Sequence, residues 1–343
     1  MIASGSFDSS IGIWKQWHND SDPNVDEDGD PIEEEEDWRL EVVFDEHESE
    51  VKSVAWNAGG NLLASCSRDK SVLVWEEMDD KNFETIAVLQ DHEGDVKCVV
   101  WHPEEDLLAS SSYDNEILLY REVIDDWEPI AVLKGHYDTV WSIDFSSTTP
   151  PSLDLSLLGS HERTKVRTDQ EDRGSRLVSG SADGTIRTWT KINKDSAKAT
   201  GGSGIPSILR TDTHQETWEE CADPSTEHDG PIYSIAWSKI TGLLVSAGHD
   251  GRIIVYQEEV YRTEDTGHDP ASVDEGDRDH AEHNRKRVLR FRWRPIAEIN
   301  QAHGDFPVNH VTWTKNWRKD SADEEVIVSS GQDGVVKLWS LAA

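Results

Sequence analysis

Six copies of one short pattern run through this 343-residue chain, and they constrain its fold more than any other feature. In every copy an Asp lies four residues after a Ser and six residues before an aromatic residue. The Asp and aromatic residues pair as Asp8 with Trp14, Asp69 with Trp75, Asp114 with Tyr120, Asp183 with Trp189, Asp250 with Tyr256, and Asp333 with Trp339. A spacing kept without error in six copies indicates one structural unit repeated six times.

A His followed by alternating apolar residues precedes five of the copies, at His47, His92, His136, His228 and His303. The His lies 22 residues before the Asp in three copies, and 47 and 30 residues before Asp183 and Asp333. Alternating apolar residues between Gly, Asp and Ser turns are typical of short strands. Each full unit is therefore predicted to form four short strands, the last one after the aromatic residue and a polar linker.

These units resemble WD40 repeats, each of which forms one blade of a β-propeller. The resemblance predicts an all-β, single-domain fold of about six blades at residues 1–43, 47–89, 92–133, 136–221, 228–299 and 303–343. Inserted loops are predicted at residues 18–37, 150–175, 193–215 and 261–287. The similar family has seven blades, so we expect an N-terminal blade and a half to be missing, either from the chain or from an incomplete gene model.

In WD40 repeats the His, Ser, Asp and Trp form a hydrogen-bonded chain that lets the buried polar groups of a blade satisfy one another. The matching residues are His47, Ser65, Asp69, Trp75, His92, Ser110, Asp114, His136, Ser179, Asp183, Trp189, His228, Ser246, Asp250, His303, Ser329, Asp333 and Trp339. The sets resemble a Ser-His-Asp triad in composition, but a nucleophile site is singular. Repetition favours an architectural role, and we predict no catalytic residue.

Charge and cysteine content exclude several classes of function. With 69 acidic and 33 basic residues the net charge is −36, which argues against a nucleic-acid surface and against an anionic membrane surface. Residues 20–37 contain eleven acids and no Lys or Arg, as solvated loops often do. The three cysteines form no Cys-x-x-Cys pair, so neither a metal site nor a cofactor is predicted.

Longer segments of the sequence show a closer resemblance, to one group of WD40 proteins. HESEVKSVAW, LLASCSRDKSVLVWE, DDWEPIAVLKGHYDTVWSIDF and GQDGVVKLWSL resemble the WD40 family of the cytosolic iron-sulfur protein assembly (CIA) targeting complex. The resemblance implies a cytoplasmic and nuclear adaptor that is not an enzyme. Its implied partners are a small acidic MIP18-type (DUF59) subunit, a large HEAT-repeat subunit, an iron-only-hydrogenase-like assembly factor and apo iron-sulfur client proteins.

Two partner-binding sites follow as expectations. Arg68 lies in the word SRDKS, next to Asp69 and close to Lys70, and the resemblance associates the matching Arg with function on the propeller surface. An exposed Arg can pair through two hydrogen bonds with a partner carboxylate. The second site is Leu119-Tyr120-Arg121, a word that iron-sulfur co-chaperones recognise. Because Tyr120 occupies the buried aromatic position, we expect only Arg121 to be free.

Two other classes compete with the adaptor of iron-sulfur assembly. One is a substrate receptor for a ubiquitin ligase or a chromatin adaptor, since WD40 proteins serve both. The degenerate Asp-x-x-x-Arg word and the docking helix typical of ligase receptors are not evident in the sequence. The other class is a propeller hydrolase, which needs a singular cluster of carboxylates or His residues, and the sequence supports none.

Overall fold

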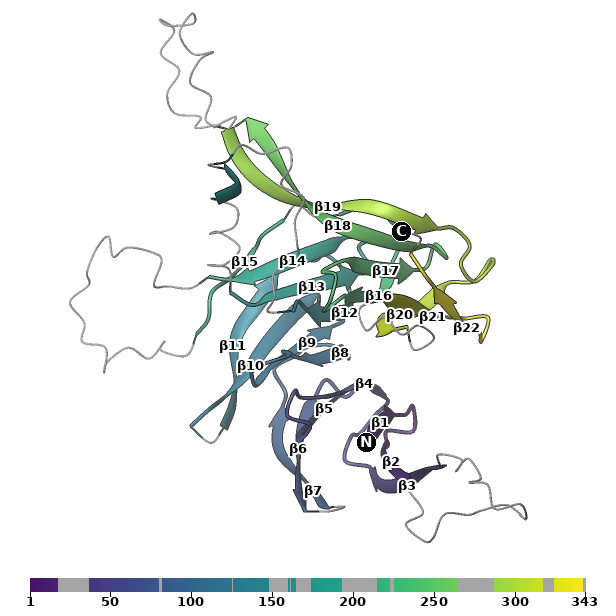
Figure 1. Cartoon of the computed structure of the whole chain (residues 1–343). Coiled ribbons are helices and arrows are strands. Elements are labelled where there is room, and N and C mark those ends of the chain that lie inside the picture. The colour runs from purple at the N-terminus through teal and green to yellow at the C-terminus, as the bar shows by residue number, and fades with distance from the viewer. Residues whose placement is uncertain are drawn as a thin grey trace, which may run out of the picture. The chain divides into compact units, whose positions relative to one another are not determined.

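The structure is a computed structural model that describes residues 1–17, 37–79, 82–124, 126–147, 160, 162–164, 174–192, 215–222, 225–264, 287–316 and 324–341. These residues form 22 strands in six antiparallel sheets (Figure 1). The prediction of an all-β fold with six blades is confirmed. Most of the four predicted insertions, at 18–37, 150–175, 193–215 and 261–287, lies outside the described residues, as does the acidic run except Asp37. Among the described residues, no helix has the length and apolarity needed to cross a membrane.

The chain divides into two compact units, and the first contains the described residues of Met1–Phe145 and Ile205–Glu216. It holds three sheets and one further strand. The sheets are β1 (Ile2–Gly5), β2 (Ile11–Trp17) and β3 (Asp37–Phe44); β4 (Val51–Trp56), β5 (Leu62–Ser67), β6 (Val72–Asp79) and β7 (Asn82–Leu89); and β8 (Val96–Trp101), β9 (Leu107–Ser112), β10 (Glu116–Val123) and β11 (Asp126–Lys134). The further strand is β12 (Val140–Phe145).

The second unit contains the described residues of Ser146–Gly204 and Thr217–Ala343. Its strands are β13 (Arg176–Ser181), β14 (Ile186–Lys191) and β15 (Trp218–Glu220); β16 (Ile232–Trp237), β17 (Leu244–Gly248), β18 (Ile253–Glu264) and β19 (Arg287–Ile299); and β20 (Val308–Lys315), β21 (Glu325–Gly331) and β22 (Val336–Trp339). The β18–β19 hairpin is long, and it runs past the other two strands of its sheet (Figure 1).

The sequence repeat reappears as a repeat of backbone irregularities. In four sheets a β-bulge lies just before the aromatic residue of the pattern, at Trp14, Trp75, Tyr120 and Tyr256. A second irregularity recurs in the first strand of the β4–β7, β8–β11, β16–β19 and β20–β22 sheets. Bulges re-aim side chains and increase the twist of a strand. The same local geometry therefore places the aromatic ring in these four sheets.

The second strand of each complete repeat is buried on both faces. Every residue of β5, β9, β13 and β17 is buried, and each of these strands has a hydrogen-bonded strand on both sides within its sheet. One apolar cluster joins the β4–β7 and β8–β11 sheets and includes Cys66, Trp101 and Tyr120. Burial raises the pKa of the Cys66 thiol far above its ordinary value. The core of each unit thus lies between the faces of its sheets.

Candidate functional site

The repeated polar residues form a continuous hydrogen-bond chain in the β4–β7 sheet, which runs from an Asp through a His and a Ser to a Trp. His47 Nδ1 lies 2.9 Å from Asp69 Oδ2, and His47 Nε2 lies 2.8 Å from Ser65 Oγ. The indole of Trp75 donates to the same Ser65 Oγ at 3.0 Å. With Asp69 ionised, His47 Nδ1 carries the proton and Nε2 accepts the Ser65 hydroxyl. Every polar group of the chain then has a partner.

The same contacts recur in other sheets. His92, His228 and His303 each bridge the Asp and the Ser of their own repeat, at distances between 2.6 and 2.9 Å. Trp189 donates to Ser179 at 3.0 Å and Trp339 to Ser329 at 2.8 Å, whereas Tyr256 accepts from Ser246 at 3.3 Å. His136 is buried in the first unit, and Asp183 accepts from the Thr185 amide.

These sets are unsuited to nucleophilic catalysis. The Ser65 side chain is fully buried and its oxygen already bonds to both His47 and Trp75. Burial opposes ionisation of Asp69, but hydrogen bonds from Ser71, His47 and the Glu48 amide outweigh it and lower the pKa of this carboxyl. The Asp is therefore held as an acceptor that orients the His. Among the described residues, no group of three His, Cys, Asp or Glu side chains is placed to hold a metal ion.

Arg68 lies on the turn between β5 and β6, and its side chain is 59% exposed. Its Nη1 donates to Glu50 Oε1 at 3.0 Å, and its Nε lies 4.0 Å from Asp95 Oδ2. Hydrogen bonds from Ser49, from the Glu50 amide and from Arg68 lower the pKa of Glu50 to about 2. Lys70 on the same turn is exposed and has a φ of 73°. The turn presents two cations, one of them positioned by carboxylates.

Two aromatic residues that sequence reasoning missed occupy the position of Arg68 on the other turns of the first unit. Phe7 is 77% exposed and Tyr113 is 63% exposed. Lys52 lies 4.2 Å from the centre of the Phe7 ring, and Lys97 lies 5.7 Å from that of Tyr113. The sequence signal that could have found them is the residue directly before the fixed Asp of the pattern, which differs from copy to copy. Cations and aromatic rings thus recur on these turns.

The left-handed position that follows the Asp differs between the two units. In the first unit Ser9, Lys70 and Asn115 adopt it, with φ between 71° and 73°. In the second unit Gly184, Gly251 and Gly334 do so. A residue with a Cβ is strained there, whereas glycine is not. The turns of the first unit therefore carry side chains at positions where glycine relieves strain.

The second predicted site is largely inaccessible. Leu119 and Tyr120 on β10 are fully buried, and burial raises the pKa of the Tyr120 hydroxyl. The expectation that Arg121 is free is not met, because its Nη2 lies 2.7 Å from Glu105 Oε2 and 3.4 Å from Glu216 Oε1. The strand alternation that predicts burial of Tyr120 says nothing of Glu216, which is distant in sequence.

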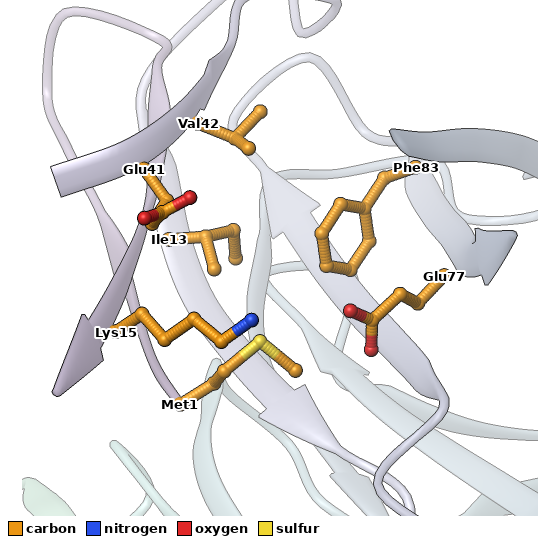
Figure 2. Close-up of a pocket in the computed structure, with 7 residues that line it drawn as sticks. All are labelled: Met1, Ile13, Lys15, Glu41, Val42, Glu77 and Phe83. Atoms are coloured by element: carbon orange, nitrogen blue, oxygen red, sulfur yellow. The ribbon is translucent and has the colours of Figure 1, made fainter. Parts of the chain in front are cut away.

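A pocket in the first unit lies among β2, β3, β6 and β7. Figure 2 shows the side chains that line it, which are Met1, Ile13, Lys15, Glu41, Val42, Glu77 and Phe83. Among these described lining residues there is no Ser, Cys or His. The lining combines apolar side chains with one cation and two carboxylates, which is ordinary packing between two sheets rather than a reaction site.

Comparison with known proteins identifies the repeats. The family model for the WD domain, G-beta repeat, matches residues 38–76, 83–121, 127–150, 158–190, 220–257 and 293–340. Three fungal relatives carry the name "Probable cytosolic iron-sulfur protein assembly protein 1". The relative from Penicillium rubens is 43% identical over 99% of this chain and 83% of its own length. The relative from Aspergillus flavus is 44% identical over 99% and 82%, and that from Coccidioides immitis 41% over 99% and 83%.

The matched repeats coincide with the strands and turns of the two units, and the identity to these relatives extends over nearly the whole chain. Similarity of this extent reflects common descent of the entire repeat array, including the turns outside the hydrogen-bond chains. The chain therefore belongs to the WD40 β-propeller family and, within it, to the cytosolic iron-sulfur protein assembly protein 1 family.

Proposed function

We propose that this chain is a scaffold of cytosolic iron-sulfur protein assembly that binds apo-client proteins and assembly factors and catalyses no reaction itself. The observation that carries the proposal is the 43% identity over 99% of the chain to a relative named for that process. The repeated Ser, His and Asp residues support a scaffold, because their polar groups are used up within the sheets. Protein binding then rests on the turns and outer strands.

Arg68 is the residue that we propose for contact with a client or partner carboxylate, with Lys70 beside it. Its side chain is more than half exposed, yet its guanidinium lies beside the carboxylates of Glu50 and Asp95. An oriented guanidinium can form two parallel hydrogen bonds with a carboxylate, which a flexible ammonium cannot. The neighbouring aromatic residues Phe7 and Tyr113 offer apolar contacts on turns of the same kind.

The finer assignments belong to the same proposal. The proposed partners are a MIP18-type (DUF59) subunit, a large HEAT-repeat subunit and an iron-only-hydrogenase-like factor. The proposed location is the nucleus as well as the cytosol. For the Leu119-Tyr120-Arg121 segment we propose that Arg121 alone contacts a partner. Its guanidinium then leaves Glu105 or Glu216 and pairs with a carboxylate of the partner. Contact through Leu119 or Tyr120 requires β10 to leave its sheet.

Affinity purification of the tagged chain from its own cells tests the proposal, with bound proteins identified by mass spectrometry. We expect iron-sulfur apoproteins and a MIP18-type subunit with the unmodified chain. Arg68→Glu is expected to reduce their recovery while far-UV circular dichroism remains unchanged. Recovery of cullin or histone partners without iron-sulfur proteins would instead assign the chain to a ubiquitin ligase or to chromatin.

The chain offers a matched control in Lys134 on β11. Lys134 is 68% exposed and pairs with Glu116, so, like Arg68, it is an exposed cation next to a carboxylate. Lys134→Glu makes the same change of charge on an outer strand of the same unit. If both variants lose the same partners to the same extent, net charge rather than the Arg68 turn governs binding, and the assignment of Arg68 is wrong.

A further inference from the structure

Lys97 on β8 is a cation held almost out of solvent beside the Arg68 turn. Its side chain is 10% exposed, against 59% for Arg68. Its Nζ lies 3.2 Å from Asp95 Oδ2, 5.0 Å from the centre of the Trp141 ring and 5.7 Å from that of Tyr113. A carboxylate and two aromatic rings each attract an ammonium group. Lys97 is therefore a fixed charge and not a mobile surface lysine.

Lys97 and Arg68 share the carboxylate of Asp95, but they share it unequally. Asp95 Oδ2 is within hydrogen-bonding distance of Lys97 Nζ, whereas it lies 4.0 Å from Arg68 Nε, beyond that distance. The Arg68 guanidinium donates instead to Glu50 Oε1, through Nη1 at 3.0 Å. The Asp95 carbonyl accepts from the Tyr113 amide, which fixes the backbone of this residue. Asp95 thus lies between two cations and bonds to the more buried one.

This unequal sharing determines which edge of the Arg68 guanidinium can meet a partner. A guanidinium pairs most strongly with a carboxylate through two parallel N–H groups. Glu50 occupies Nη1, while Nε and Nη2 form a second pair of donors on another edge of the group. Asp95 lies beside that edge, near Nε, without bonding to it. Without the ammonium of Lys97, Asp95 could turn onto the Nε–Nη2 edge and block it.

We propose that Lys97 is a positioning residue for Arg68, which holds Asp95 and so keeps the Nε–Nη2 edge open to a carboxylate of a client or assembly factor. The inference rests on the proposed binding role of Arg68. Because little of the Lys97 side chain is exposed, it acts through Asp95 and not by its own contact with the partner. Loss of Lys97 is therefore expected to close the Arg68 site, although Arg68 itself is unchanged.

Phenylglyoxal, a reagent that modifies guanidinium groups, tests this closure without any partner. The full chain is labelled in native buffer, and mass spectrometry gives the rate at Arg68, with the exposed Arg294 on β19 as internal reference. Lys97→Met keeps a long unbranched side chain and removes its charge. It is expected to slow the labelling of Arg68 by about threefold, the effect of one additional surface ion pair. Lys97→Met/Asp95→Asn is expected to restore the rate of the unmodified chain.

Two controls separate this role from an effect of net charge. Lys52 is the second residue of β4, as Lys97 is of β8, and Lys52→Met is expected to leave the labelling of Arg68 unchanged. Lys97→Met/Glu93→Gln has the same net charge as Lys97→Met/Asp95→Asn but retains Asp95, so slow labelling is expected to persist. An unchanged rate in Lys97→Met, or equal recovery in both double variants, overturns the proposal. Lys97→Gln replaces Lys97→Met if that variant does not fold.

Affinity purification of the same variants connects the labelling to binding. The probe is the set of proteins recovered with the unmodified chain and lost in Arg68→Glu. Lys97→Met is expected to recover about threefold less of them, and Lys97→Met/Asp95→Asn to recover them fully. Slow labelling with undiminished recovery overturns the role of Lys97 in binding. If Arg68→Glu loses no protein, the proposed function of Arg68 fails, whereas the labelling rates still decide whether Lys97 controls access to its guanidinium.

Discussion

Arg176 on β13 and Glu258 on β18 form a buried ion pair with two hydrogen bonds, of 2.7 and 3.0 Å. The two side chains are only 8% and 1% exposed. The guanidinium carbon also lies 5.0 Å from the centre of the Trp237 ring, and its Nη2 lies 3.9 Å from Cys221 Sγ. Strands of two different sheets in the second unit are thus joined by one desolvated contact between opposite charges.

Arg176→Met is expected to lower the free energy of unfolding by about 3–5 kcal/mol, because the buried Glu258 carboxylate loses the guanidinium that forms two hydrogen bonds with it. The double variant Arg176→Met/Glu258→Leu is expected to recover most of that loss, since apolar side chains of similar size replace both charges. Urea unfolding followed by tryptophan fluorescence measures both changes. Equal losses in the single and double variants would show that packing, rather than the ion pair, sets the stability here.

Adjacent serines on β9 provide a matched test of the hydrogen-bond chain. Ser110 Oγ lies 2.6 Å from His92 Nε2, whereas the buried Ser111 Oγ has no hydrogen-bond partner within the described structure. Ser110→Ala is expected to destabilise the first unit by about 1–3 kcal/mol, because the His nitrogen loses its partner. Ser111→Ala is expected to be neutral or slightly stabilising. Thermal unfolding distinguishes them, and equal shifts would contradict the assigned role of Ser110.

Lys70→Gly is expected to stabilise the chain by about 0.5–1 kcal/mol, because glycine removes the strain of a left-handed residue with a Cβ. The control is Asn115→Gly, at the same position of the next repeat, with a φ of 71°. Asn tolerates this conformation better than Lys, so its replacement gains less. If partner capture falls in Lys70→Gly while the melting temperature rises, Lys70 has a binding role at the expense of stability.

Acid is expected to weaken the fold through the repeated Asp residues. Burial opposes ionisation of Asp250, but hydrogen bonds from His228 and Arg252 outweigh it and hold its pKa well below the ordinary value of 3.8. Asp69 and Asp114 shift in the same direction. A carboxyl with a depressed pKa contributes stability that is full above its ordinary pKa and is lost as the pH falls through its folded pKa.

Asp250→Asn should therefore be less stable than the unmodified chain at neutral pH, and the difference should narrow as the pH falls below about 4. Melting temperatures measured from pH 7 down to the onset of acid unfolding give the comparison. A difference that stays constant over this range would show that the Asp250 carboxylate acts through its shape and hydrogen bonds alone, and not through its charge.

Sequence spacing predicts the strands and the turns, and the resemblance to WD40 repeats implies the hydrogen-bond chain; all three depend on short separations along the chain. The distance from Ser65 to Asp69 and on to Trp75 is set by one strand, one turn and half of the next strand. His47 precedes the hairpin of β4 and β5, so it is separated from Ser65 by that one hairpin. The same few residues recur in each unit, so their contacts can be inferred from one copy and carried to the others.

Contacts between distant segments could not be predicted in this way. Glu216 reaches Arg121 from 95 residues away, and Glu258 reaches Arg176 from 82 residues away. Strand residues 261–264 of β18 and 287–292 of β19 were also missed, because charged residues on both strands hide the alternation that marks a half-buried strand. Arg290, Arg292 and Arg294 alternate visibly in the sequence, but the β18 residues opposite them are known only from the register of the hairpin.

Because β5 is completely buried, the rate at which Cys66 is alkylated measures how often its sheet opens. The thiol is shielded on both faces and its raised pKa keeps it protonated, so an alkylating reagent cannot react with it in the closed molecule. Its labelling rate in native buffer consequently reports how often β5 becomes exposed. Comparison of that rate with and without a bound partner reveals whether binding tightens the first unit, with no cysteine introduced into the protein.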